Sequence, residues 1–466
     1  MHLGDLFPLA SFDLETATTE VLSVEIDSRQ CTFGSLFVAH GHDDVLVRTH
    51  VTDALARGAV AVVSTRPLGL PVPEVIVEAS ELGRVSAQLA ADLSGHPERD
   101  LTLVGVTGTN GKTTVASLIS HLLANAGRSS GVIGTLTQVR TTPAAPELYR
   151  HLSQWRAYFG PAALEPTVVL EVSSHALVQD RVAGLTFELA VFTNLSHDHL
   201  DYHGSMEEYF AAKARLFTPE YSRRALVWVD NPYGERLSQS AGVEVVRVSR
   251  DDASDVVGTL LGTTFIWRAR VVSSALVGGY NVDNLLVAMA AASELGLSDP
   301  EIVAGVGSFT PVEGRFSIVR AGGIDAVVDY AHTPDGLERL LSDVRSLSTG
   351  RVITVFGCGG DRDRAKRPRM GEVASRASDL TIVTSDNPRH ESPDAIMNEI
   401  VSGVVAGSRV ERVADRAEAI ARAVAVAEPG DVVVVAGKGH ERTQVFADRE
   451  VPFNDHDVVA EELRKR

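Results

Sequence analysis

The sequence predicts an α/β protein of three domains, in which the second and third domains each contain a largely parallel sheet. Its 466 residues exceed the usual size of one domain. From about residue 100 onward, short apolar runs alternate with amphipathic stretches, which is typical of parallel strands covered by helices on both faces. A glycine-rich turn at residues 107–114 joins one such strand to one such helix. We expect the domains to span residues 1–97, 98–312 and 313–466.

The first domain is expected to be small and rich in short strands. Apolar, β-branched runs predict strands at residues 21–26, 34–39, 59–64 and 75–77, with one helix near residues 51–57. The segment Ser-Gly-His-Pro-Glu-Arg-Asp at residues 94–100 is typical of a linker. This linker precedes the strand that enters the glycine-rich turn.

The second and third domains are expected to repeat a strand–helix alternation. In the second, we predict strands at 101–106, 167–172, 189–194 and 225–230, and helices at 115–126, 206–217 and 281–295. In the third, we predict strands at 326–330, 352–356, 380–384 and 432–436, with helices that begin near Pro334, Pro368, Pro393 and Ala414. Ligands of open α/β sheets bind at the carboxyl ends of the strands. The polar residues that follow these strands are therefore candidates for chemistry.

The composition is that of a globular protein, with 44% hydrophobic and 22% charged residues. A formal net charge of −18 argues against a nucleic-acid partner, because clustered Lys and Arg bind phosphate backbones. Cys31 and Cys358 are too few and too far apart for a disulfide framework or a zinc motif. The sequence contains no secretory signal and no apolar run of roughly 20 residues. We therefore expect a cytoplasmic protein that does not insert into a membrane.

The glycine-rich turn reads Thr-Gly-Thr-Asn-Gly-Lys-Thr-Thr. The N–H groups of such a turn can surround a polyphosphate, while Lys112 reaches the terminal phosphates and Thr113 offers a hydroxyl to Mg²⁺. The general phosphate-loop pattern has a glycine five positions before Gly111, where this chain has Val106. The turn is thus a shorter Gly-x-x-Gly-Lys-Thr, and we predict that it binds a nucleoside triphosphate.

A metal site is predicted where two neighbouring strands of the second domain end. Glu171 and His199 follow these strands, close to the threonine of the turn, and could form the sparse protein shell that Mg²⁺ uses when it also binds substrate phosphates. An alternative is a zinc site formed by His197, His199 and His203. Nearby carboxylates and the phosphate loop favour the Mg²⁺ site. Lys213, on the next predicted helix, is by itself typical of a solvated surface residue.

Three charged segments of the third domain, at residues 357–368, 385–389 and 437–441, follow successive predicted strands. Guanidinium groups match carboxylates in geometry, whereas Asp and Glu accept hydrogen bonds from an ammonium group. A pocket that contains Arg362, Arg389, Asp386 and Glu441 would therefore suit an amino acid that carries both charges. The alternative is a set of solvated loops with incidental ion pairs.

These segments together resemble the Mur ligases, from about residue 103 to residue 457, with a weaker match at residues 27–29 and 34–39. Seven motifs carry the resemblance: Thr-Gly-Thr-Asn-Gly-Lys-Thr-Thr at 107–114, Glu-Val-Ser-Ser-His at 171–175, Thr-Asn-Leu-Ser-x-Asp-His-Leu-Asp-Tyr-His at 193–203, Tyr-Asn-Val-x-Asn at 280–284, Gly-Arg-Phe at 314–316, Asp-Tyr-Ala-His-Thr-Pro-Asp at 329–335 and Gly-Lys-Gly-His-Glu at 437–441. The shortened turn is this family's own version. The resemblance implies a UDP-substrate-binding first domain, an ATP-binding second domain like phosphate-loop ATPases, and an amino-acid-binding, Rossmann-like third domain.

The resemblance also implies roles for individual residues. ATP contacts are implied for Gly108, Thr109, Asn110, Gly111, Lys112, Thr113, Thr114, Asn284, Arg315, Asp329, His332 and Asp335. Contacts to the UDP-linked substrate are implied for Ser28, Thr141, Thr142, Ser173, Gln179 and Arg181, and amino-acid contacts for Arg362, Asp386, Asn387, Pro388, Arg389, Gly437 and Glu441. Two Mg²⁺ ions would be bound by Thr113, Glu171, His199 and a carbamylated Lys213. Lys112, His199 and Lys213 would be the catalytic residues.

The activity that the resemblance implies is ATP-dependent addition of meso-diaminopimelate to UDP-N-acetylmuramoyl-L-alanyl-D-glutamate, through an acyl phosphate, in peptidoglycan precursor synthesis. Arg389 in the segment Asp-Asn-Pro-Arg is the family's mark of diaminopimelate use, and lysine has no distal carboxylate for this guanidinium to bind. The expected partners are these small molecules alone, and the expected state is a monomer.

Three places depart from the family's pattern: residues 41–48, residues 136–140 and His197. The first two lie where the uridine nucleotide and its sugar would bind. Two alternatives therefore stay open, namely a ligase of the same mechanism that acts on a different carboxylate, and a binding protein in which ATP acts only as a switch.

Overall fold

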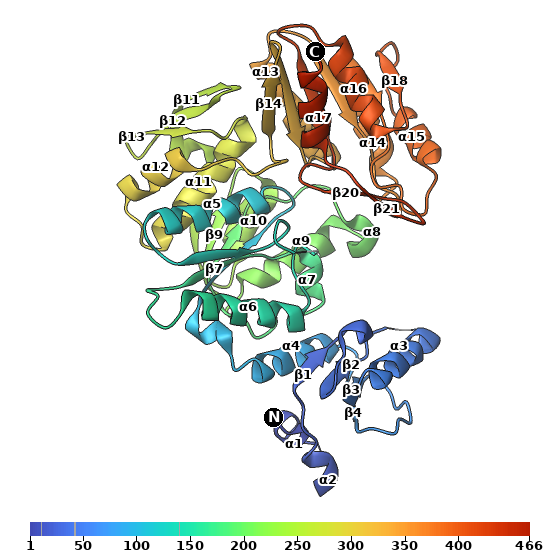
Figure 1. Ribbon diagram of the computed structural model, residues 1–466. Coiled ribbons are helices and arrows are strands. Elements are labelled where there is room, and N and C mark those ends of the chain that lie inside the picture. Colours follow the sequence, from blue (N-terminus) through green and yellow to red (C-terminus); the bar gives the residue numbers. More distant parts are fainter. Residues whose placement is uncertain (11, 42, 139) are drawn as a thin grey trace.

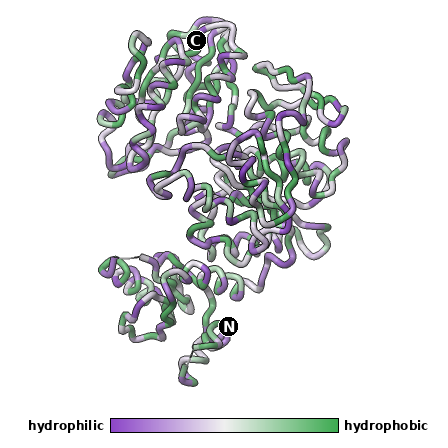
Figure 2. The backbone as a smooth tube through the Cα atoms, turned by 180° about the vertical axis from the view of Figure 1, so that it is seen from behind, coloured by the Kyte–Doolittle hydropathy of each residue, from purple (hydrophilic) through white to green (hydrophobic). Residues whose placement is uncertain are grey.

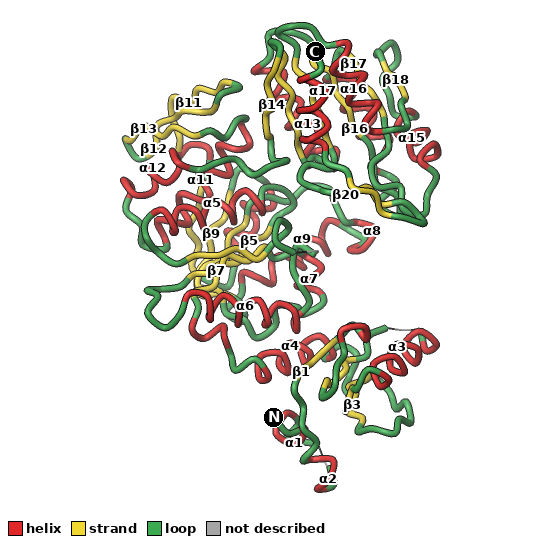
Figure 3. Tube along the Cα trace, in the orientation of Figure 1, coloured by secondary structure: helices red, strands yellow, loops and turns green. Residues whose placement is uncertain are grey.

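The computed structural model describes residues 1–10, 12–41, 43–138 and 140–466, which form three successive lobes along the chain (Figure 1). His42 and Val139, which belong to the two segments that depart from the Mur ligase pattern, lie outside the described residues. In Figure 3, helices lie on both sides of the strands in the second and third lobes. This arrangement confirms the predicted α/β class.

The first lobe contains a four-stranded parallel sheet in the order β1-β2-β3-β4. Its elements are α1 (Leu3–Leu6), α2 (Leu14–Ala17), β1 (Ser23–Glu25), β2 (Ser35–Val38), α3 (Asp44–Ala56), β3 (Ala59–Ser64), β4 (Glu74–Ile76) and α4 (Leu82–Leu93). Helix α3 begins several residues before the predicted position. The reason is a cap at Asp43, whose Oδ1 accepts hydrogen bonds from the backbone N–H groups of Val45 and Leu46 at 2.8 and 3.1 Å.

The second lobe is built on a six-stranded parallel sheet in the order β10-β9-β8-β5-β7-β6. Its elements are β5 (Thr102–Thr107), α5 (Lys112–Asn125), β6 (Ser130–Ile133), α6 (Ala145–Phe159), β7 (Thr167–Glu171), α7 (Ser174–Val178), β8 (Phe187–Phe192), α8 (Leu200–His203), α9 (Met206–Ala214), β9 (Ser222–Trp228), α10 (Pro232–Ser240), β10 (Glu244–Val248), α11 (Gly279–Glu294) and α12 (Asp299–Ser308). Successive residues of β5 face opposite cores: Leu103 belongs to one and Val104 to the other. Strand β5 is therefore central, and its carboxyl end opens into the glycine-rich turn.

A small antiparallel sheet follows the second lobe's main sheet and was not predicted. Its strands are β11 (Ala253–Thr259), β12 (Gly262–Trp267) and β13 (Arg270–Ser274), paired in chain order. Phe265, Trp267 and Val272 point into the second lobe's core, whereas β11 is largely exposed.

The third lobe contains a six-stranded sheet in the order β14-β15-β19-β16-β17-β18, in which only the edge strand β14 is antiparallel within the described residues. Its elements are β14 (Ser317–Ala321), β15 (Ile324–Asp329), α13 (Pro334–Leu347), β16 (Val352–Phe356), α14 (Lys366–Ala377), β17 (Leu380–Val383), α15 (Pro393–Val401), β18 (Val410–Arg412), α16 (Arg416–Val426), β19 (Val432–Ala436), β20 (Thr443–Val445), β21 (Glu450–Pro452) and α17 (Asp455–Arg464). Hydrophobic residues run along these strands in Figure 2. Within the described ranges, no helix combines the length and apolar character needed to cross a membrane.

Two glycines bring the start of the third lobe against one of its charged segments. Gly314 and Gly439 both have positive φ, at 71° and 52°. A Cβ on Gly314 would overlap the backbone of Gly439 and His440, and a Cβ on Gly439 would lie 2.6 Å from the Gly314 carbonyl oxygen. The two segments therefore meet backbone to backbone.

Candidate active site

A cavity of about 780 Å³ lies at the carboxyl ends of β5, β7 and β8, and residues of the third lobe close one side of it. Its lining contains these predicted site residues: Thr109, Asn110, Gly111, Lys112, Thr113, Thr114, Thr141, Glu171, His199, Asn284, Arg315, Asp329 and His332. Gly108 and Asp335 adjoin it through hydrogen bonds to Lys112 and Asn110. The structure thus brings together all the residues predicted to contact ATP.

The glycine-rich turn ends at Gly111, whose φ of 85° lets the chain enter α5 at Lys112. A side chain at Gly111 would overlap the side-chain oxygen of Asn284, so that the turn and α11 approach closely. Lys112 Nζ donates to the carbonyl oxygens of Gly108 and Thr109, each at 2.9 Å. The first N–H groups of α5 and this ammonium together favour a bound polyphosphate.

Glu171 is the buried carboxylate nearest the start of α5. One of its oxygens accepts a hydrogen bond from Thr113 Oγ1 at 3.0 Å, and the carboxylate also accepts from the backbone N–H and the hydroxyl of Thr135. Oxygen donors of this kind suit Mg²⁺. His199, at a left-handed φ of 54°, begins α8 on the cavity wall.

The predicted zinc alternative lacks a compact ligand set among the described residues, which contain no group of three or more His, Cys, Asp or Glu able to hold a metal ion by themselves. His203 is buried, with its Nε2 2.9 Å from Ser174 Oγ. Its position is therefore explained by packing.

Lys213 is buried, not solvated, with 2% of its surface exposed. Its Nζ donates to the Gly108 carbonyl oxygen at 2.9 Å and lies 4.8 Å from the centre of the Tyr209 ring. In the described part of the chain, no carboxylate lies within 4 Å of this amine. Burial, with a contribution from Lys112, lowers the pKa of Lys213 well below its ordinary value.

Residues of the third lobe contact the glycine-rich turn directly. Arg315 Nη2 donates to Thr113 Oγ1 at 3.1 Å, and its guanidinium lies 4.4 Å from the centre of the Tyr330 ring. Asn110 Nδ2 donates to Asp335 Oδ2 at 3.3 Å. Asp329, whose pKa is raised by burial, accepts the N–H groups of Phe316 and Ala331 at 2.7 and 2.8 Å.

The residues predicted to contact the UDP-linked substrate form one group, apart from Ser28. Thr142 Oγ1 donates to the Glu171 carbonyl oxygen at 2.8 Å, and Arg181 donates to the Thr142 carbonyl oxygen at 2.7 Å. The remaining members, Thr141, Ser173 and Gln179, are linked to them through hydrogen bonds or lie beside them. Ser28 lies in the first lobe, and no hydrogen bond of the described residues joins it to this group.

The residues of the predicted amino-acid site lie together where β16, β17 and β19 end. Asn387 Nδ2 donates to Glu441 Oε2 at 2.8 Å, and a Cβ on Gly437 would lie 2.7 Å from Asp386 Oδ2. Arg389 Nη1 donates to the Gly360 carbonyl oxygen at 2.8 Å. Burial and the neighbouring Arg362 lower the pKa of Arg389. The structure therefore places both guanidiniums and both carboxylates near one another, and their role in binding an amino acid stays a prediction.

Arg389 has a left-handed backbone, with a φ of 51°. This conformation is uncommon for a residue other than glycine and is held here by the surrounding contacts. Its N–H donates to the Val445 carbonyl oxygen at 3.0 Å, and a side chain at Gly360 would overlap the Pro388 carbonyl oxygen. The segment with Pro388 and Arg389 thus packs closely against the loop that contains Arg362.

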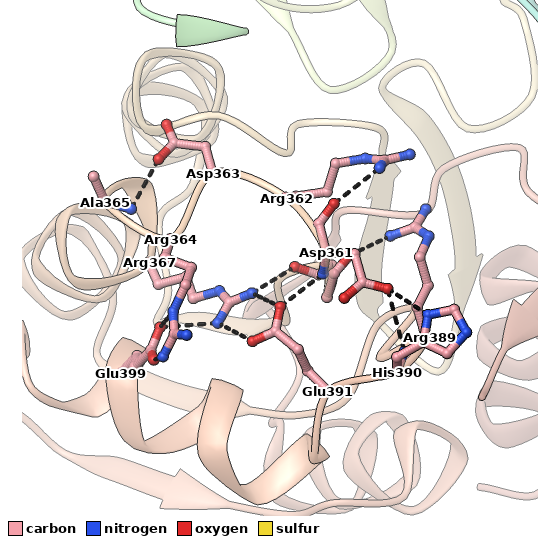
Figure 4. A network of polar contacts seen from close by, with 12 residues as sticks. Asp361, Arg362, Asp363, Arg364, Ala365, Arg367, Arg389, His390, Glu391 and Glu399 are labelled. Carbon is pink, nitrogen blue, oxygen red and sulfur yellow. Dashed lines mark hydrogen bonds and ion pairs between the residues drawn. The ribbon is translucent and has the colours of Figure 1, made fainter. Parts of the chain in front are cut away.

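The buried guanidinium of Arg367 also contacts this loop, as Figure 4 shows. Arg367, which is fully buried, donates to Glu391 at 2.7 and 2.9 Å, to Glu399 at 2.8 Å and to the Gly359 carbonyl oxygen at 3.1 Å. Glu391 also accepts the N–H of Asp361 at 2.6 Å. The network therefore joins the loop to the Arg389 segment through ion pairs.

Comparison with known proteins gives the family. Residues 106–292 match the family model of the Mur ligase middle domain, and residues 314–439 match that of the Mur ligase, glutamate ligase domain. The chain is 42% identical over 495 residues to the UDP-N-acetylmuramoyl-L-alanyl-D-glutamate--2,6-diaminopimelate ligase of Gloeobacter violaceus, covering 100% of this chain and 99% of the relative. The chain belongs to the Mur ligase family. A relative of the same name from Nostoc sp. is 40% identical over 481 residues, covering 97% of this Mur ligase and 95% of the relative.

Solved structures agree with this assignment. A structure of a UDP-N-acetylmuramoyl-L-alanyl-D-glutamate--2,6-diaminopimelate ligase superposes with a TM-score of 0.66 and 32% identity, covering 100% of this Mur ligase and 99% of that chain. The MurF ligase of Thermotoga maritima in complex with ADP has a TM-score of 0.67 at 19% identity, covering 96% and 99%. At 19% identity, the similarity to this MurF ligase supports the fold alone.

Sequence reasoning missed three residues of this Mur ligase's site. Tyr280 lines the cavity with its hydroxyl 3.4 Å from Asp329 Oδ2. Lys438 and Arg367 lie fully buried behind the amino-acid pocket. Tyr280 and Lys438 lie within the quoted motifs, which was the available signal. Arg367 resembles its exposed basic neighbours in sequence, and no local pattern distinguishes it.

Proposed function

We propose that this Mur ligase is an ATP-dependent amide ligase that adds meso-diaminopimelate to UDP-N-acetylmuramoyl-L-alanyl-D-glutamate in peptidoglycan precursor synthesis. The observation that carries the proposal is the cluster of four charged side chains at the ends of β16, β17 and β19: Arg362, Arg389, Asp386 and Glu441. Two guanidiniums and two carboxylates complement a diamino dicarboxylic acid, which has two groups of each charge. A monocarboxylic diamine such as lysine would leave one guanidinium without its partner.

The ATP half of the reaction rests on the glycine-rich turn. The D-glutamate side-chain carboxylate attacks the γ-phosphorus of ATP, so that a C–O–P bond forms and the bond to ADP breaks. Lys112, whose ammonium now binds carbonyl oxygens of the turn, can exchange them for phosphate oxygens. Arg315 adds a second positive charge beside Thr113. Both cations stabilise the charge that develops on the transferred phosphoryl group.

The amine of diaminopimelate then attacks the acyl carbon, loses a proton and displaces inorganic phosphate. Because most of the predicted ATP contacts come from the second lobe and the predicted amino-acid contacts from the third, the two lobes must be held at a fixed separation for the attack. Hydrogen bonds from Arg315 to Thr113 and from Asn110 to Asp335 do this across the cavity. We infer a domain division at residues 1–97, 98–312 and 313–466, with the small molecules named above as the only partners.

Thr113, Glu171 and His199 fit a Mg²⁺ site because their oxygen and imidazole donors face the cavity beside the start of α5. When bound, Mg²⁺ would neutralise phosphate charge and orient the γ-phosphate. Lys213 fits a carbamate, because its buried amine has no carboxylate partner among the described residues and a buried unpaired ammonium is costly. The neutral amine adds CO2 and loses one proton, and the resulting carboxylate-like group would bind a second ion.

A phosphate-release assay tests the proposal. We expect release only when ATP, the UDP-linked dipeptide and meso-diaminopimelate are all present, together with a product whose mass equals the dipeptide plus diaminopimelate minus one water. Release with ATP alone would contradict a ligase. Release with a different carboxylate, but not with the UDP-linked dipeptide, would favour a ligase of the same mechanism with another substrate. Binding of ATP with no release under any condition would favour the switch.

A further inference from the structure

Lysine is scarce in this chain, which contains five lysines among 43 basic residues. Lys465 is an exposed residue near the carboxyl end, with 57% of its side chain exposed. Lys112 and Lys213 adjoin the glycine-rich turn, and Lys366 begins α14 as a buried residue. The fifth, Lys438, is fully buried in the segment 437–441. Arginine thus supplies nearly all exposed cations, and the other four lysines are buried or adjoin the glycine-rich turn.

Lys438 binds the polar groups that line the predicted amino-acid pocket. Its Nζ donates to Asn387 Oδ1 at 2.9 Å and to Glu441 Oε2 at 2.7 Å. The same Glu441 oxygen accepts from Asn387 Nδ2 at 2.8 Å, and Asn387 Oδ1 also accepts from the N–H of Val445 at 3.0 Å. The three side chains therefore form a closed triangle of hydrogen bonds between the ends of β17 and β19.

This triangle fixes which groups remain free for a ligand. The Glu441 side chain is 31% exposed: one carboxylate oxygen accepts hydrogen bonds from Lys438 and Asn387, and none of the described residues donates to the other. Asn387 has its oxygen occupied by Lys438 and Val445. A planar guanidinium could not replace the compact, tetrahedral ammonium in this fully enclosed position without displacing its neighbours.

We propose that Lys438 is a positioning residue for the amino-acid substrate: it orients Glu441 and Asn387 so that the free oxygen of Glu441 accepts a hydrogen bond from a substrate ammonium group. The inference rests on the proposed function, and it concerns a residue for which no contact with substrate is needed. The positive charge of Lys438 also complements the negative charge of Glu441, which holds the carboxylate in one orientation before the substrate arrives.

The test is a double-mutant cycle on the full-length protein, with Lys438→Met, Glu441→Gln and the combined variant. Lys438→Met is expected to raise the KM for meso-diaminopimelate about 10–100-fold and to change the KM for ATP less than about 3-fold. The reason is that the triangle of hydrogen bonds lies at the amino-acid site and not at the ATP site. If Lys438 acts through Glu441, the combined variant should lose no more than Glu441→Gln alone. Lys465→Met, an exposed lysine, is the matched control and should behave as wild type.

The outcomes separate this inference from the proposed function. A wild-type enzyme that does not use meso-diaminopimelate would refute the proposed function itself. An active wild type whose Lys438→Met variant keeps its KM for the amino acid, or loses ATP and amino acid equally, would overturn the role of Lys438, as would additive losses in the cycle. Should Lys438→Met not fold, the combined variant removes both charges together, and its KM compared with that of Glu441→Gln still decides the question.

Discussion

Arg315 of the third lobe donates a hydrogen bond to the hydroxyl of Thr113 in the second lobe, with Nη2 and Oγ1 3.1 Å apart. Thr113 Oγ1 in turn donates to Glu171 at 3.0 Å. The guanidinium is held in place by the face of the Tyr330 ring. A cation from one lobe thus lies beside the residues predicted to bind Mg²⁺ in the other, where it can respond to the phosphates of ATP.

Arg315→Ala is expected to lower kcat/KM for ATP by about 100-fold, the usual order for loss of a charged group that stabilises a phosphoryl transition state. The measurement is steady-state phosphate release at saturating amino acid and UDP-linked dipeptide. Arg320→Ala is the control, since Arg320 pairs with Asp325 at 2.7 Å in the same lobe. Equal losses in the two variants would mean that the effect comes from general destabilisation.

Lys213→Ala is expected to lose at least about 100-fold in kcat, because the proposed carbamate would be absent. Added short carboxylates such as acetate should restore part of the rate, since the cavity left by the side chain can admit them. Lys465→Ala should neither lose activity nor respond to acetate. An unchanged rate in Lys213→Ala would show that the buried amine has no part in catalysis.

Arg389→Ala is expected to raise the KM for meso-diaminopimelate about 30–100-fold, because one charge-assisted contact is lost, while ATP affinity stays within about 3-fold. The preference for diaminopimelate over lysine should fall in parallel. His390→Ala changes the neighbouring exposed side chain and serves as the control. If ATP and diaminopimelate weaken by the same factor, the arginine supports the fold and not the specificity.

Acid should remove one identifiable part of the stability. Hydrogen bonds from Arg367, together with the N–H of Asp361, lower the pKa of Glu391 from 4.5 to about 2. The unfolded chain therefore binds this proton more readily, so the contribution is complete above pH 4.5 and is lost as the pH falls toward about 2. We expect the difference in thermal midpoint between wild type and Glu391→Gln to shrink across that window. A difference that is constant with pH would contradict the assignment.

The strands of the parallel sheets were predictable from sequence because they are buried on both faces. Val432 to Ala436 is an uninterrupted apolar run that forms β19, with Val432 and Val434 facing one core and Val433 and Val435 the other. The small antiparallel sheet was missed for the opposite reason. Strand β11 is mostly exposed, so it carries no apolar run, and its position depends on pairing with β12.

The gathering of many site residues was predictable because the carboxyl ends of parallel strands meet at one edge of a sheet: Glu171 ends β7 in the second lobe, and Asp386 follows β17 in the third. The buried residues that hydrogen-bond to these site residues were not predictable. Lys438 and Arg367 are charged residues that are enclosed only after distant segments meet: Asn387 lies 51 positions from Lys438 in the sequence, and Glu391 lies 24 from Arg367. A sequence read locally predicts solvent around both, since charged side chains are rarely buried unless paired.

Gly314 and Gly439 pack the start of the third lobe tightly against the segment that contains Lys438 and Glu441. Because the two segments are in contact through their backbones, a displacement of one segment moves the other, without flexible side chains between them to absorb it. Arg315 and Glu441 lie close in sequence to these two glycines, so a rotation of the third lobe that separated Arg315 from Thr113 would also move Glu441 relative to the second lobe. Motion of the third lobe relative to the second would therefore change the proposed ATP contacts and the proposed amino-acid contacts together.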